Sequence, residues 1–221
     1  MSLDLGNVPP VTSSLFQRLA RESFMSSFSL VGGTALSLQL GHRQSEDLDF
    51  IFDGEKINSI GIKRFIAKLF PDYRLIREEK GYQLDFLLQG VKLTFFSTAA
   101  VLIPFPVKEH TIRYGTLNIA NVSAISTLKM ATISQRCTIR DYYDLYYVSK
   151  FVIPLAEIYK TTKALIPNLS PITYSETIVY IMDIPETSVD SHLFPKEIVS
   201  KEQIAEYFIE EIKKMKGSHG I

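Results

Sequence analysis

The sequence LVGGTALSLQLGHRQSEDLDFIF, residues 30–52, carries the densest structural signals of the chain. An apolar run at residues 28–31 predicts a short buried strand, and Gly32-Gly33 then marks a turn. Residues 34–40 have the pattern of a short helix. The stretch therefore predicts a strand, a glycine turn and a helix, followed by a second strand.

That second strand, residues 47–52, presents two carboxylates, Asp47 and Asp49. Residues two apart on a strand point to the same face, about 6.5 to 7 Å apart along the strand. Leu48 and Phe50 then point into the core. Mg²⁺ takes oxygen ligands, usually one or two carboxylates and the phosphates of a substrate. The pair therefore predicts a metal site; solvated acids on an exposed strand are the alternative, because the D-x-D pattern is short and common.

The glycine pair is a candidate phosphate-binding turn. Gly32 and Gly33 allow left-handed backbone angles and close approach of a ligand, and the helix that follows offers unpaired N–H groups. Thr34 adds a hydroxyl that can contact the same oxygens. The structural alternative is a tight turn where a strand and a helix pack closely.

The combination resembles the signature of the nucleotidyltransferase superfamily, whose members share the palm of DNA polymerase β. GGTALSLQLGHRQSEDLDF, residues 32–50, is similar to the AbiEii/AbiGii toxin-type family. LKMATISQRCTIRDYYDLYYVSK, residues 128–150, is similar to that family's downstream helical motif. Together the two blocks lie within residues 28–150.

The resemblance implies an enzyme that moves a nucleotidyl group from an NTP to an acceptor hydroxyl. It implies that Gly32 and Gly33 hold the phosphates and that Asp47 and Asp49 bind Mg²⁺, with Mn²⁺ as a substitute. It also implies RNA, such as a tRNA end, or a protein as the acceptor. The biological role implied is that of a toxin with an antitoxin protein as partner.

Basic residues supply further candidates for nucleotide binding. Arg43 precedes the two acids in the connecting loop. Five residues of the second block match the family motif, of which three are basic candidates and two are acids: Lys129, Arg136 and Arg140, with Asp141 and Asp144. An ammonium suits a phosphate as a point charge, and a guanidinium can neutralise charge during phosphoryl transfer.

Structural roles remain open for part of the second block. Arg140, Asp141 and Asp144 can instead form ion pairs, and Thr138 with Asp141 fits a variant of the capping box. A nearby group of tyrosines is better explained by core packing than by base stacking: Tyr142, Tyr143, Tyr146 and Tyr147.

The sequence departs from the superfamily at the third carboxylate, which lies on a later strand. The matching position is Thr94, which cannot be a carboxylate ligand. If Gln89-Gly90 is a two-residue hairpin turn, Asp85 faces Thr94 across the hairpin and is a candidate catalytic replacement. A slip of one residue would put Asp85 on the opposite face, where it would be a solvated strand acid.

We expect an α+β fold, a nucleotidyltransferase-like mixed β-sheet with flanking helices, followed by a helical C-terminal half. Strands are predicted at residues 73–78, 83–88, 91–96 and 111–118, the last as a strand or a ribbon. Helices are predicted at residues 13–24, 62–70, 123–135, 139–150, 154–165 and 202–216. The change of periodicity near Asn121 predicts a core at residues 1–120 and a mostly helical region packed on it at residues 121–221. Residues 167–195 carry several prolines and receive no assignment.

Composition limits the classes of function. The 24 basic and 24 acidic residues give a net charge of zero, which argues against a general nucleic-acid binder and predicts that RNA contacts come from a restricted basic patch. There is a single cysteine, Cys137, and no apolar stretch long enough to cross a membrane. We expect a soluble cytoplasmic protein without membrane contacts.

Two other functions stay open at this point. The missing third carboxylate favours a module that binds an NTP or a partner protein and regulates without turnover. A weaker alternative is an interaction protein whose helical half forms a dimer or antitoxin interface.

Overall fold

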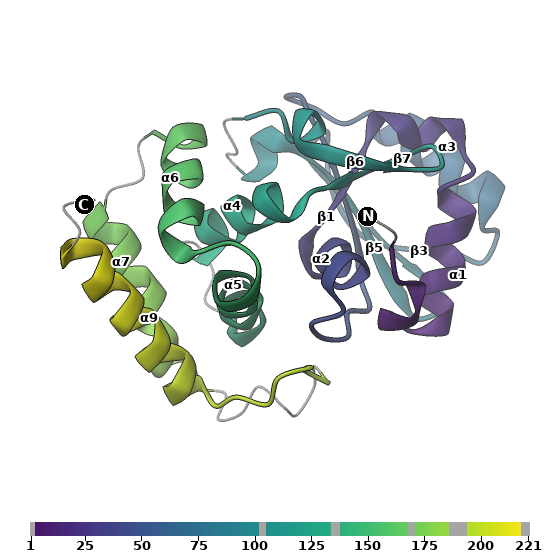
Figure 1. Ribbon diagram of the computed structural model, residues 1–221. Helices are drawn as coiled ribbons and strands as arrows, with labels where there is room; N and C mark the ends of the chain where they lie inside the picture. Colours follow the sequence, from purple (N-terminus) through teal and green to yellow (C-terminus); the bar gives the residue numbers. More distant parts are fainter. Residues whose placement is uncertain (1–2, 102–104, 134–137, 168–170, 186–193, 218–221) are drawn as a thin grey trace. The chain divides into compact units, whose positions relative to one another are not determined.

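The computed structural model describes residues 3–101, 105–133, 138–167, 171–185 and 194–217. The chain divides into two compact units, Met1–Ala124 and Ile125–Ile221 (Figure 1). This division lies four residues after the expected boundary. In the part of the chain that the structure describes, no helix is long and apolar enough to span a bilayer.

The first unit is built on a seven-stranded sheet with the strand order β3-β4-β5-β2-β1-β7-β6. The strands are β1 (Ser29–Val31), β2 (Leu48–Phe52), β3 (Arg74–Glu79), β4 (Gln83–Leu88), β5 (Val91–Ser97), β6 (Thr111–Tyr114) and β7 (Leu117–Ala120). The pairs β2–β5 and β1–β7 are parallel and the others are antiparallel, so the sheet is mixed as expected. The expected strand or ribbon at residues 111–118 is the β6–β7 hairpin.

Apolar side chains alternate along β2, β4 and β5 and form the core on one face of the sheet. Phe50, Phe86 and Phe95 are fully buried there. The unit's helices are α1 (Pro10–Leu19), α2 (Gly32–Leu40) and α3 (Ser59–Leu69), with short 3-10 turns η1 (Leu5–Asn7), η2 (Ser23–Ser27), η3 (Thr98–Val101) and η4 (Val107–His110). Figure 1 shows α1 and α3 on the same side of the sheet. The first helix begins three residues before its expected start, because Pro10 is well suited to a first helical turn.

The second unit is helical. Its elements are α4 (Val122–Ile133), which begins in the first unit, α5 (Ile139–Phe151), α6 (Leu155–Leu165), α7 (Pro171–Val179), η5 (Tyr180–Asp183) and α9 (Lys201–Gly217). Helix α7 and η5 lie in the proline-containing segment that sequence patterns leave unassigned. The four tyrosines of α5 are buried, as their core assignment predicts, and the Tyr142 hydroxyl donates to the Thr177 carbonyl at 2.7 Å.

Tyr143 predicts a loss of stability at alkaline pH. Its hydroxyl is buried and hydrogen-bonded to the Glu197 backbone, and burial is the main cause that raises its pKa from the ordinary 10.0 to about 12. Between these two values the unfolded chain ionises this tyrosine and the folded chain does not. Stability should therefore be retained below pH 10.0 and should fall as the pH approaches about 12. Urea unfolding measured at several pH values in this window should show the free energy of unfolding falling as the pH rises. Tyr143→Phe should make this fall less steep. An equally steep fall in the variant would contradict the role given to Tyr143.

Candidate active site

Strand β1 ends where helix α2 begins, and Asp49 lies beside this junction. Val31 is the cross-strand partner of Asp49, and Gly32 follows with a positive φ of 75°. A Cβ at Gly32 would lie 3.0 Å from Asp49 Oδ2. The Asp49 carboxylate therefore rests against the backbone of the first turn of α2, as close approach to a glycine allows.

The loop between α2 and β2 covers the second glycine. A Cβ at Gly33 would clash with the Arg43 guanidinium and would lie 3.0 Å from Ser45 Oγ. Arg43 is buried, and its Nη1 donates to the Gln44 carbonyl at 2.7 Å. The glycine pair thus permits close packing, which is the structural alternative, and it also brings Arg43 and Asp49 to the start of one helix.

Thr34 holds this loop in place. Its hydroxyl donates to the Asp47 carbonyl and lies 2.9 Å from Ser45 Oγ. A hydroxyl has one proton to donate. In this structure Thr34 donates it to the loop and not to a ligand oxygen. Ser45 is a residue that sequence reasoning does not select, because an isolated loop serine carries no pattern.

Asp47 and Asp49 present their carboxylates at the start of β2. Asp47 directly precedes the strand rather than lying within it, and both side chains are partly exposed. The first turn of α2 contributes the positive end of a helix dipole, and Arg43 adds a full positive charge against Gly33. The arrangement places carboxylates next to a group of positive partial and full charges, which suits a ligand that combines phosphates with a cation.

The expected register of the β4–β5 hairpin is confirmed. Gln89 and Gly90 have φ values of 51° and 86°, Leu88 pairs with Val91, and Asp85 pairs with Thr94. Thr94 also pairs with Asp49 across β2–β5. These pairings make one row across the sheet in the order Asp49, Thr94, Asp85.

The row leaves the catalytic role of Asp85 a prediction, because the observed contacts of this carboxylate are with other residues. Two strand spacings separate Asp85 from Asp49, roughly 9 to 10 Å. The Asp85 carboxylate instead accepts from Gln83 Nε2 at 2.7 Å and lies 3.6 Å from Lys92 Nζ. Among the described residues, no three His, Cys, Asp or Glu side chains are close enough to hold one metal ion. The partner of Asp49 on β5 is Thr94, whose buried hydroxyl has no hydrogen-bond partner in the described part of the chain.

The basic residues of the second sequence block lie in the second unit. Lys129 is buried, and its Nζ is 2.6 Å from both Asp141 Oδ1 and Asp144 Oδ2. The structure therefore gives Lys129 two carboxylate partners within its own unit. Arg140 is exposed on α5, and Arg136 lies outside the described residues.

The capping-box variant predicted at Thr138 and Asp141 lacks the bond expected from the Thr138 side chain to the helix backbone. Thr138 is the N-cap of α5, but its side chain accepts no backbone N–H. Its hydroxyl donates to Asp141 Oδ2 at 2.8 Å instead. Asp141 is thus tied to Thr138 and Lys129 together, which explains its burial at the start of a helix.

Replacing Gly32 by alanine should destabilise the first unit. The residue has a φ of 75°, and the new Cβ would meet Asp49 Oδ2 at 3.0 Å. We expect the free energy of unfolding to fall by about 1–2 kcal/mol, measured by urea unfolding. Gly217→Ala, at a helix end with open space around it, should be close to neutral. Equal stability of the two variants would contradict the role given to Gly32.

Comparisons with known proteins find relatives by sequence. The family model described as nucleotidyl transferase AbiEii toxin, Type IV TA system, matches residues 14–169. An uncharacterised protein of Aquifex aeolicus is 34% identical over 177 residues, which cover 77% of this chain and 84% of that protein.

Solved structures show the same fold. A Helicobacter pylori protein assigned as a nucleotidyltransferase superposes with a TM-score of 0.60 at 19% identity, over 94% of each chain. MenT4, a nucleotidyltransferase toxin of Mycobacterium tuberculosis, superposes with a TM-score of 0.54 at 13% identity, over 90% of this chain and 82% of that one. The match over residues 14–169 includes both blocks that carry the sequence resemblance, and the chain belongs to the AbiEii nucleotidyl transferase toxin family.

Proposed function

We propose that this protein transfers a nucleotidyl group from an NTP to an acceptor hydroxyl, with Mg²⁺ held by Asp47 and Asp49. The observation that carries the proposal is the placement of Asp49 against Gly32 and of Arg43 against Gly33, at the start of one helix. Carboxylates for a cation and positive groups for phosphates thereby meet within a few residues. Membership of the family supports nucleotidyl transfer as the reaction class.

The donor set fits a magnesium ion. Asp47 and Asp49 offer carboxylate oxygens, which Mg²⁺ prefers, and Mn²⁺ accepts the same ligands. The buried Thr94 hydroxyl beside Asp49 has no hydrogen-bond partner among the described residues and can meet a further oxygen. When bound, the ion would neutralise phosphate charge and orient an in-line displacement.

The chain's own residues have separate roles in this proposal. The backbone at Gly32 and Gly33 approaches the phosphates, and Arg43 offsets their negative charge. Thr34 and Ser45 hold the loop that positions Asp47. Lys129, with Arg136 and Arg140, remains the sequence-based proposal for contacts to the triphosphate, and Lys129 would have to exchange a carboxylate partner to make them.

The acceptor and the partner are proposed from the family. RNA, such as a tRNA end, is the acceptor that the toxin family suggests, with a protein hydroxyl as the second class. An antitoxin protein is the proposed partner, since the family is described as part of a Type IV toxin–antitoxin system.

A nucleotide-binding module without turnover is the second candidate function. It is favoured by Thr94 at the third-acid position and by the absence, among the described residues, of a cluster of three metal-binding side chains. A site with two carboxylates holds a metal–nucleotide less tightly and has no third acid to take the acceptor's proton.

The experiment is label transfer from each α-labelled NTP with Mg²⁺ or Mn²⁺, in the presence of total cellular RNA and protein. Label on one acceptor, lost in Asp47→Ala/Asp49→Ala and retained in the exposed control Asp72→Asn, supports the transferase. Binding of metal and NTP without any label transfer supports the module. Absence of both would contradict the proposed site.

A further inference from the structure

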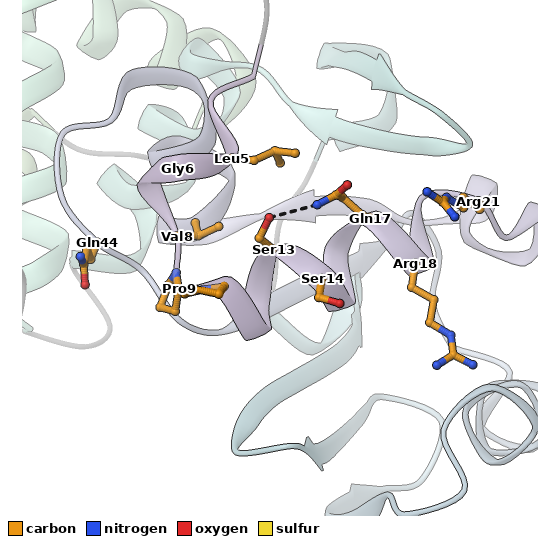
Figure 2. Close-up of a pocket in the computed structure, with 11 residues that line it drawn as sticks. Leu5, Gly6, Val8, Pro9, Ser13, Ser14, Gln17, Arg18, Arg21 and Gln44 are labelled. Atoms are coloured by element: carbon orange, nitrogen blue, oxygen red, sulfur yellow. Dashed lines mark hydrogen bonds between the residues drawn. The ribbon is translucent and has the colours of Figure 1, made fainter.

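A pocket of about 730 Å³ lies beside α1 in the first unit, outside the group formed by Gly32, Gly33 and Asp49. This volume is in the range of ligand sites. Its polar lining comes from one face of α1 and the turn after it, together with one residue of the loop before β2: Ser13, Ser14, Gln17, Arg18, Arg21 and Gln44 (Figure 2). No residue given a role in the proposed reaction lines it.

The pocket carries a local positive charge. Arg18 and Arg21 line it, and none of the described residues around it is Asp or Glu. Both arginines are exposed, and neither forms an ion pair with a described carboxylate. The Arg18 guanidinium lies 4.7 Å from the centre of the Phe70 ring, which orders the group without neutralising it. Two uncompensated guanidinium groups in a chain of zero net charge mark a site for an anion.

The arginines and the neutral polar side chains of the pocket together suit a phosphate-bearing ligand that is longer than one phosphate group. Guanidinium groups match phosphate oxygens as paired donors. Gln17 Nε2 donates to Ser13 Oγ at 3.2 Å, so these two side chains form an ordered polar pair in the wall. Figure 2 shows Gln44 at the end of the pocket opposite Arg18 and Arg21. A ligand that reaches both ends has to extend beyond one anionic group.

One loop contributes to both the pocket and the candidate active site, because it carries Gln44 as well as Arg43 and Asp47. The Gln44 carbonyl accepts from Arg43 Nη1 at 2.7 Å, and Arg43 packs against Gly33. Thr12 of α1 donates to the Glu46 carbonyl at 2.8 Å, one residue before Asp47. Helix α1 therefore supports the segment that leads to the two acids.

We propose that the α1 pocket binds the sugar–phosphate backbone of a nucleic-acid acceptor and leads its reacting end toward Asp47 and Asp49. This inference rests on the proposed function for the identity of the acceptor. It also supplies the restricted basic patch that a chain without net charge requires for such binding.

Binding of a fluorescein-labelled single-stranded RNA of about 12 nucleotides to the full chain tests the proposal. Arg18→Gln/Arg21→Gln should weaken binding about tenfold or more, and the slope of log K against log salt should fall by about 1.4 for two lost phosphate contacts. Arg64→Gln/Lys68→Gln removes the same charge from exposed positions of α3 and should leave binding within about twofold of the wild type. Ser14→Glu, which adds an acid to the pocket, should weaken binding without removing a native contact.

Competition identifies the ligand chemistry. Unlabelled RNA should displace the probe, whereas inorganic phosphate should do so only at much higher concentration. Displacement by inorganic phosphate as readily as by RNA would overturn the acceptor site in favour of a simple anion site. Equal displacement by polyglutamate would overturn it in favour of an acidic protein segment. Unchanged RNA binding in both pocket variants, or no binding by the wild type, would also overturn it.

The two proposals fail separately. Asp47→Asn/Asp49→Asn should keep RNA binding while losing label transfer. If the wild type transfers no label but RNA binding still depends on Arg18 and Arg21, the proposed function fails and the pocket stands as an RNA-binding site without an acceptor role. If label is transferred and RNA binding ignores Arg18 and Arg21, the pocket fails alone.

Discussion

Asp49→Asn should lower the rate of nucleotidyl transfer by about a thousandfold or more. The carboxylate lies against Gly32 at the start of α2, where the amide of asparagine keeps the shape but loses the charge that a divalent cation requires. Because the replacement has the same shape, we expect the free energy of unfolding to change by no more than about 1 kcal/mol. The rate is measured in single turnover with the labelled NTP, and stability by urea unfolding.

A binding measurement separates the role of Asp49 in holding the metal from its effect on the rate of nucleotidyl transfer. Titration with Mn²⁺ should show weaker binding to Asp49→Asn than to the wild type, whatever the activity. Asp72→Asn removes an exposed carboxylate from the same unit and should leave both the rate and Mn²⁺ binding unchanged. A variant Asp49→Asn that transfers label at the wild-type rate would exclude Asp49 as a metal ligand.

Lys129→Met should lower the free energy of unfolding by about 3–5 kcal/mol, because it leaves two buried carboxylates without their shared cation. Lys129 Nζ lies 2.6 Å from oxygens of Asp141 and Asp144, and all three side chains are at most 8% exposed. Circular dichroism during urea unfolding measures the loss from the helices of the second unit. Lys68→Met, at an exposed position of α3, is the control and should be nearly neutral.

A compensating variant tests the physical reason. Lys129→Met/Asp141→Asn/Asp144→Asn removes the cation and both anions, so it should recover most of the lost stability. The nucleotide-binding role predicted from the sequence gives a different result. In that case Lys129→Met would also raise the KM for the NTP, and the triple variant would recover stability without restoring the KM.

The local parts of the site are well predicted by sequence. The turn at Gly32, the helix after it and the alternation around Asp49 depend on neighbours a few residues away, so backbone freedom and side-chain periodicity specify them. The Asp85–Thr94 pairing follows from the two-residue turn at Gln89-Gly90 in the same way, because a short turn sets the register of its hairpin.

Contacts between residues far apart in the sequence cannot be predicted from these local patterns. Sequence spacing selects Lys129 as a cation for phosphate, but its partners Asp141 and Asp144 are 12 and 15 residues away on another helix. The pairing of β2 with β5 joins Asp49 to Thr94 across 45 residues. No local signal specifies either contact, because each depends on how separately formed elements pack.

The sequence by itself determined the family, the mixed α+β fold class and the identity of the paired acids with their glycine turn, because these depend on local periodicity and on motifs that keep their spacing. Only the tertiary structure decided that the Asp85 carboxylate contacts Gln83 and Lys92, that Arg43 packs on Gly33, and that Arg18 and Arg21 line a pocket whose described lining residues include no acid. Sheet register between distant strands and the packing of a loop on a helix are set by burial and hydrogen bonding of the whole unit.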